Sequence, residues 1–127
     1  MANKIKITPE LGGEMDCGLH SIGFSEQAIT STSNEATVDW KLSNKAKLTL
    51  SEDVSTLNFT APTNPCNVLL RVIQDSTPRT IAWPASVIWS GGTAPTLTTT
   101  SGFVDIVCFY FDGTYFYGSF IQNFDIT

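Results

Sequence analysis

Apolar and polar residues alternate along several short stretches of this chain, and turn-forming residues separate the stretches. In "ATVDWKLS", residues 36–43, Ala36, Val38 and Trp40 fall on one side of an extended chain and the polar residues on the other. A period of two is typical of a β-strand, and no segment keeps helical spacing. The alternation therefore predicts an all-β fold. Further strands are expected over 46–50, 56–61, 66–74, 79–83, 103–111 and 114–120.

The pair Asp112-Gly113 lies between the last two of these predicted strands. Asp-Gly is typical of a tight two-residue hairpin turn, which needs positive φ angles that glycine adopts easily. We therefore expect Asp112 and Gly113 to join 103–111 to 114–120. Many short strands with frequent turns favour antiparallel pairing in a sandwich or barrel-like module.

Within the first 35 residues "KIKIT" at 4–8 alternates like a short strand, and the rest mixes glycine, polar residues and scattered apolar ones without a sustained period. We expect residues 1–35 to form an extended N-terminal arm and residues 36–127 to form the β-rich module. A tail without anchors is the alternative for the first segment. The apolar residues expected to anchor the arm on a partner are Leu19, Ile22, Phe24 and Ile29.

Charged residues are scarce in the second half of the chain. From Val54 to Thr127 there are six among 74 residues, without a lysine or a glutamate. An ordinary soluble domain has about a quarter of its residues charged. The net charge of −5 argues against nucleic acid as a partner, because such binding needs a basic surface. No stretch reaches the length of a membrane span, so no membrane partner is expected.

The predicted strand 103–111 is apolar on both faces, although one face of an antiparallel sheet is usually wet. A second sheet of the same chain or a neighbouring copy could cover it. Because charge is so scarce here, we favour burial between subunits of a homotrimer. The residues expected at that interface are Phe103, Val107, Phe109 and Phe111.

Arg71 and Asp105 are charged residues on two otherwise apolar predicted strands. A buried charge is unfavourable unless it is paired. We therefore expect a structural ion pair of Arg71 with Asp105, or of each with its equivalent in a neighbouring copy.

Residues for catalysis or metal binding do not form a recognisable set. His20 follows Cys17 by three residues, but two ligands do not close a metal site. There is neither a nucleophile elbow nor a phosphate-binding loop. We expect no catalytic residue, no metal and no cofactor.

The cysteines and the aromatic residues are the remaining candidates for a structural link or a binding surface. Three cysteines without a C-x-x-C motif suggest no disulfide framework, and Cys66 and Cys108 are expected to be buried. Aromatic rings could form a sugar-binding platform, although packing in a core or interface is the commoner role of tryptophan. The candidates are Trp40, Trp83, Trp89, Tyr115 and Tyr117.

Several stretches carry a resemblance to known proteins. They are "VDW" at 38–40, "KLTL" at 47–50, "LLRVIQDSTPRTIAWPASVIWSGGTAPTLTT" at 69–99, "GFVDIVCFYFDGTYFYG" at 102–118 and "NF" at 123–124. With these, residues 36–124 resemble a β-rich module of tailed-bacteriophage virion proteins, which include tail fibres and small capsid-associated proteins. The chain departs from the pattern at Thr77-Pro78, where the family often has glycine. The resemblance implies a structural role in the virion and no catalytic residue.

A small chain made mostly of this module is expected to be a capsid decoration or cement protein. It would bind the outer shell as a trimer, with itself and the major capsid protein or another virion protein as partners. Its start has no apolar core of signal-peptide length, so we expect assembly into the virion in the bacterial cytoplasm. A tail or tail-fibre component with a receptor-binding role is the alternative, and a glycan hydrolase is the third class.

Overall fold

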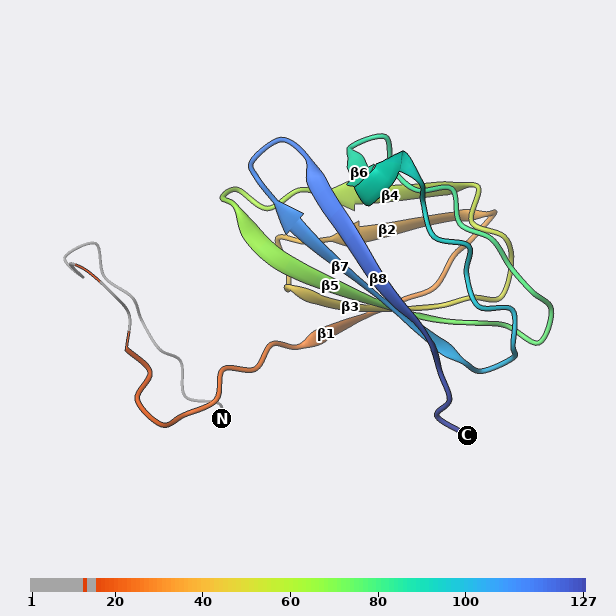
Figure 1. Cartoon of the computed structure of the whole chain (residues 1–127), viewed down its shortest axis with the longest axis horizontal. Coiled ribbons are helices and arrows are strands. Elements are labelled where there is room, and N and C mark those ends of the chain that lie inside the picture. Colours follow the sequence, from red (N-terminus) through yellow and green to blue (C-terminus); the bar gives the residue numbers. More distant parts are fainter. Residues whose placement is uncertain (1–12, 14–15) are drawn as a thin grey trace.

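Strands make up nearly all the regular structure of this chain (Figure 1). The computed structural model describes residue 13 and residues 16–127. The expectation of an all-β fold is confirmed for these residues. The strands are β1 Glu26–Ile29, β2 Glu35–Asp39, β3 Lys45–Thr49, β4 Thr56–Thr60, β5 Cys66–Ile73, β6 Val87–Trp89, β7 Val104–Phe111 and β8 Phe116–Phe124; one turn of 3₁₀ helix, η1, covers Ser90–Gly92.

The strands form two sheets, and most neighbouring pairs are parallel. Six strands lie in the order β1-β3-β5-β7-β8-β6, and β2 pairs with β4 in the second sheet. Only β5–β7 and β7–β8 are antiparallel among the described pairs. The predicted antiparallel arrangement is therefore wrong for the first half of the chain. From β1 to β5 the chain alternates between the sheets, and the strand in the opposite sheet supplies the long crossover that parallel pairing needs.

The core lies where the inward faces of the two sheets meet. The alternation seen in the sequence places Val38 of β2 and Leu57 of β4 on one side of it, and Leu48 of β3 and Leu70 of β5 on the other. All four are almost fully buried. The period of two thus gives each of these strands one apolar face that the opposite sheet removes from water.

The residues predicted to contact other subunits lie in or beside this core. Val107, Phe109 and Phe111 are each at most 3% exposed within one chain. Phe59 of the second sheet packs its ring edge against Phe109, with centroids 5.3 Å apart, while Phe103 precedes β7 and is half-buried. The predicted subunit interface is wrong at the three buried positions, because a second sheet of the same chain already covers them.

The N-terminal boundary also differs from the prediction. The sheet begins at Glu26, and Ile29 packs in β1 against the core, so Ile29 is not an arm residue and the boundary at residue 35 is wrong. Residues 16–25 contain no strand and run away from the sheets in Figure 1. Leu19, Ile22 and Phe24 are exposed there; the earlier part of the predicted arm is outside the described residues, except for residue 13.

The chain reverses between β7 and β8 as an antiparallel hairpin around Asp112 and Gly113. The connection has four residues rather than two, since Phe111 pairs with Phe116. Gly113 alone of these four has positive φ, at 102°, and the Asp112 carboxylate accepts backbone N–H bonds from Thr114 and Tyr115, both at 2.7 Å. The side chain of Asp112, rather than its backbone angle, therefore fixes the turn.

Candidate functional site

A groove of about 340 Å³ opens on the outer face of the six-stranded sheet. Its polar and aromatic lining comes from Lys45 of β3, Asn67 of β5, Tyr110 of β7, and Tyr117 and Ser119 of β8. The strand register brings these positions together, because Tyr110 is paired with both Asn67 and Tyr117. We call this the tyrosine groove. It lies on the side of the sheet away from the core.

The two tyrosines form a fixed aromatic surface. Their ring centroids are 6.4 Å apart and their planes differ by 30°, and both side chains are nearly half exposed. The Tyr117 hydroxyl donates a hydrogen bond of 3.0 Å to Asp112 Oδ2, which raises the pKa of Tyr117. Hydrogen bonds from two backbone N–H groups hold the pKa of Asp112 below its usual value, with the larger effect from Tyr115 and the smaller from Thr114. The hairpin turn thus holds one ring of the pair in place.

Positive side chains lie on the same outer face, toward β1. Arg71 forms a bidentate ion pair with Glu26, at 2.8 and 2.7 Å. These hydrogen bonds lower the pKa of Glu26 and raise that of Arg71. The predicted pairing of Arg71 with Asp105 is therefore wrong. In contrast, within residues 16–127 the side chain of Lys45 forms no ion pair or hydrogen bond, and its backbone N–H donates to the Ser43 hydroxyl.

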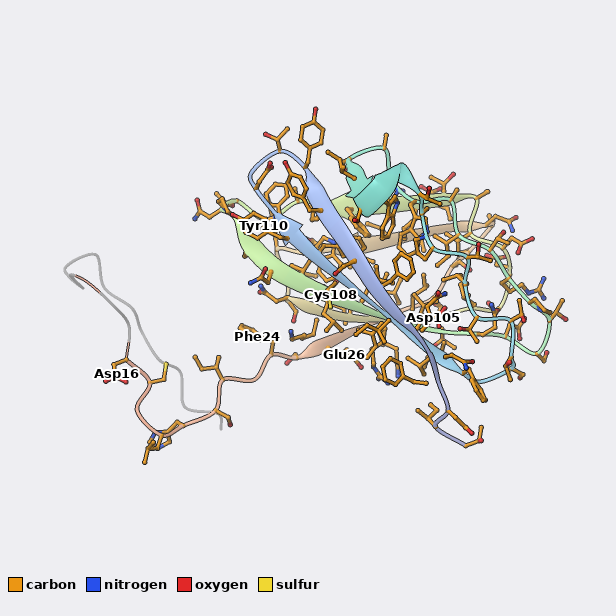
Figure 2. The ribbon with its side chains drawn as sticks, in the orientation of Figure 1. Asp16, Phe24, Glu26, Asp105, Cys108 and Tyr110 are labelled. Atoms are coloured by element: carbon orange, nitrogen blue, oxygen red, sulfur yellow. The ribbon has the colours of Figure 1, made fainter. Side chains whose placement is uncertain are left out.

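Asp105 is buried, at 3% exposure, and forms no ion pair within residues 16–127. Its carboxylate accepts hydrogen bonds from the Thr98 backbone N–H at 2.7 Å, the Thr98 hydroxyl at 2.6 Å and the Asn123 backbone N–H at 3.0 Å. Figure 2 shows Asp105 and Tyr110 at opposite ends of β7. The carboxylate therefore joins the loop before β7 to the end of β8, far from the groove.

Exposed apolar side chains gather along the second half of β8 and the residues after it. We call Phe120, Ile121, Phe124 and Ile126 the apolar strip; each is at least 40% exposed, and Ile121 is 65% exposed. β6 pairs with β8 at Phe116, Tyr117 and Gly118, and no other described strand pairs with the rest of β8 on that side. An apolar strand with an unpaired edge is typical of a surface that another chain covers.

The tryptophans do not form an exposed platform. Trp40 is 2% exposed, and Trp83 and Trp89 pack against the core. Of the aromatic candidates, Tyr115 and Tyr117 are at the surface. The expectation of buried cysteines is wrong for Cys108, which is exposed and lines the tyrosine groove, while Cys66 is half-buried.

Groups that could bind a metal do not come together among residues 13 and 16–127: no cluster holds three or more histidine, cysteine or acidic residues. His20 Nδ1 lies 3.2 Å from the carbonyl oxygen of Cys17. In the same part of the chain, no helix has the length and apolarity to cross a membrane.

The sequence reasoning missed Tyr110, Asn67 and Lys45 as candidates for a site. The two-residue turn expected at Asp112-Gly113 would place Tyr110 opposite Tyr115, and the four-residue connection of the structure instead pairs it with Tyr117. Nothing in the sequence marks Lys45 either, since its position follows from the parallel pairing of β3 with β5.

Comparison of the chain with protein-family models, with curated proteins and with solved structures yields no match.

Proposed function

We propose that this chain is a structural protein of a bacteriophage virion that assembles as a homotrimer and reinforces the capsid without chemistry of its own. In this proposal the two sheets form a sandwich-like module, and the segment before β1 serves as an arm. The observation that carries the proposal is the apolar strip, in a chain whose second half has few charges. The resemblance of residues 36–124 to phage virion modules favours the particle as the place of action.

Self-association follows from the strip because large apolar side chains leave water when a second surface covers them. Three copies around a common axis would cover the strip in a closed assembly. The exposed side chains of Leu19, Ile22 and Phe24 would then be present three times, in position to contact capsid subunits. Several weak contacts on one trimer act together, so attachment can be tight although each contact is modest.

The double variant Ile121→Asp/Phe124→Asp should be a monomer where the unchanged protein is a trimer. Two carboxylates would have to leave water at the subunit contact, which is strongly unfavourable. Sedimentation at micromolar concentration measures the change. Leu42→Asp is the matched control, since Leu42 is 75% exposed but lies outside the strip. A trimeric double variant, or an unchanged protein that is monomeric, would contradict the assignment of the strip.

Phage particles stripped of the protein should burst at a lower temperature than complete particles, yet still adsorb to cells. A protein that binds the assembled shell and not its dissociated parts stabilises the shell by mass action. Adding back the protein should restore heat resistance, and the monomeric double variant should restore less. Particles that keep their heat resistance but lose adsorption would instead assign the protein to the tail.

A further inference from the structure

We propose that the tyrosine groove binds a saccharide that carries a carboxylate, such as a chain containing a uronic acid. The groove lies beside the apolar strip, because Ser119 and Ile121 are successive residues on one face of β8, but the inference does not depend on trimer formation or on a place in the capsid. It rests on the combination of two neighbouring tyrosine rings, neutral polar side chains and one cation that forms no ion pair within residues 16–127, all around a single groove.

The aromatic pair matches the apolar face of a sugar ring. C–H groups on that face carry a small positive charge and pack well on the negative face of an aromatic ring. Tyr110 and Tyr117 present such a surface at the outside of β7 and β8, and the hydrogen bond from Tyr117 to Asp112 reduces the freedom lost on binding. Tyr110 and Cys108, both labelled in Figure 2, are the two exposed residues of β7.

The remaining lining matches the hydroxyl edges of a sugar. Asn67 and Ser119 are exposed beside the rings and can both donate and accept hydrogen bonds. The groove volume, about 340 Å³, falls at the lower end of small-ligand pockets. These features suit one or a few sugar units in a shallow site better than the broad contact of a protein partner.

Lys45 decides the charge of the ligand. Lys45 lines the groove, and in the described part of the chain its ammonium forms no ion pair. Lys47, the next outward residue of β3, lies close enough to Glu26 to lower the pKa of that carboxyl. Arg71 is also neutralised by Glu26. The positive charge available in the groove is therefore that of Lys45, which is complementary to a carboxylate.

Two tetrasaccharides test the inference on the full-length protein. The acidic probe alternates glucuronic acid with N-acetylglucosamine, and the neutral probe contains N-acetylglucosamine alone. NMR titration of the backbone amides at millimolar probe should show saturable shifts around Tyr110 and Tyr117, with the acidic probe bound more tightly. Tyr117→Ala should weaken its binding about tenfold, and Lys45→Met should abolish the preference for it.

Matched variants separate the groove from general surface effects. Tyr115→Ala and Lys47→Met should leave binding unchanged, because neither residue lines the groove. The melting temperature checks that each variant is folded, and Tyr110→Ala provides a second test of the platform. The inference is overturned if the acidic probe does not bind, if Tyr117→Ala binds it normally, or if Lys45→Met keeps the preference. Shifts at the groove that depend on protein concentration alone would overturn it in favour of a second copy.

Discussion

Replacing Phe109 with alanine should lower the free energy of unfolding by about 3–5 kcal/mol, the usual effect of removing a buried phenylalanine. Phe109 is 2% exposed, and its ring lies within 6.5 Å, centroid to centroid, of the rings of Trp40, Phe59, Trp83, Trp89 and Phe116. A cavity at this position removes contacts from both sheets at once. Urea denaturation followed by tryptophan fluorescence measures the loss.

Tyr110→Ala is the matched control for Phe109→Ala. It removes an aromatic side chain from the next position of β7, but one that is 48% exposed, so it should change the free energy of unfolding by less than about 1 kcal/mol. If Phe109→Ala does not fold, Phe109→Leu leaves a smaller void and should be measurably less stable than the unchanged protein. A loss below 1 kcal/mol for Phe109→Ala would contradict the position of Phe109 in the core.

The positions of several strands could be predicted because apolar and polar residues alternate along them, which gives each strand one apolar face. The expected strands at 46–50, 56–61 and 66–74 differ from β3, β4 and β5 by at most one residue at each end. The predicted strand at 79–83 is not a regular strand, since only Ile81 forms a bridge, to Val54. Alternation identifies which side chains face inward. It does not ensure that a neighbouring strand is present, and the described part of the chain gives residues 79–83 a single isolated bridge rather than a paired strand.

Strand pairing could not be predicted in the same way. The period of two is the same for parallel and antiparallel neighbours, so it does not identify the winding of β1 to β5 between two sheets. β1 was missed because it is short and turns a polar residue inward. The Gln27 side chain bonds the backbone N–H and carbonyl of Asp39 and the carbonyl of Ser43. Those partners, far along the chain, make an inward glutamine stable there.

What covers the apolar faces of β7 also could not be predicted from the sequence, because it depends on tertiary contacts. Two apolar faces are expected whether a second sheet or a second copy covers the strand, and the sequence alone does not separate these cases.

Gly118 is a further position whose role the sequence does not reveal. A side-chain carbon there would lie 2.5 Å from the Trp89 ring, so the close packing of Trp89 on β8 requires glycine. In the sequence, Gly118 is one of nine glycines and nothing marks it as a packing position.

Asp105→Ala should lower the free energy of unfolding by about 3 kcal/mol, although Asp105 forms no ion pair in the described part of the chain. Hydrogen bonds to a charged group contribute about 1.5–3 kcal/mol each, and buried donors left without an acceptor are unfavourable by a similar amount. The variant would leave the backbone N–H groups of Thr98 and Asn123 without their acceptor. Since these residues lie in the loop before β7 and at the end of β8, both segments should loosen together.

Denaturation in urea and amide hydrogen exchange test this prediction at two levels. The variant should unfold at lower urea, and exchange should accelerate first at Thr98 and Asn123 because their hydrogen bonds are the ones removed. Asp125→Ala is the control: within residues 16–127 the Asp125 carboxylate bonds Thr127 alone, in an exposed segment, so the loss of stability should be near zero. Equal losses for the two variants, or slow exchange at Thr98 in Asp105→Ala, would show that the buried carboxylate does not hold these segments together.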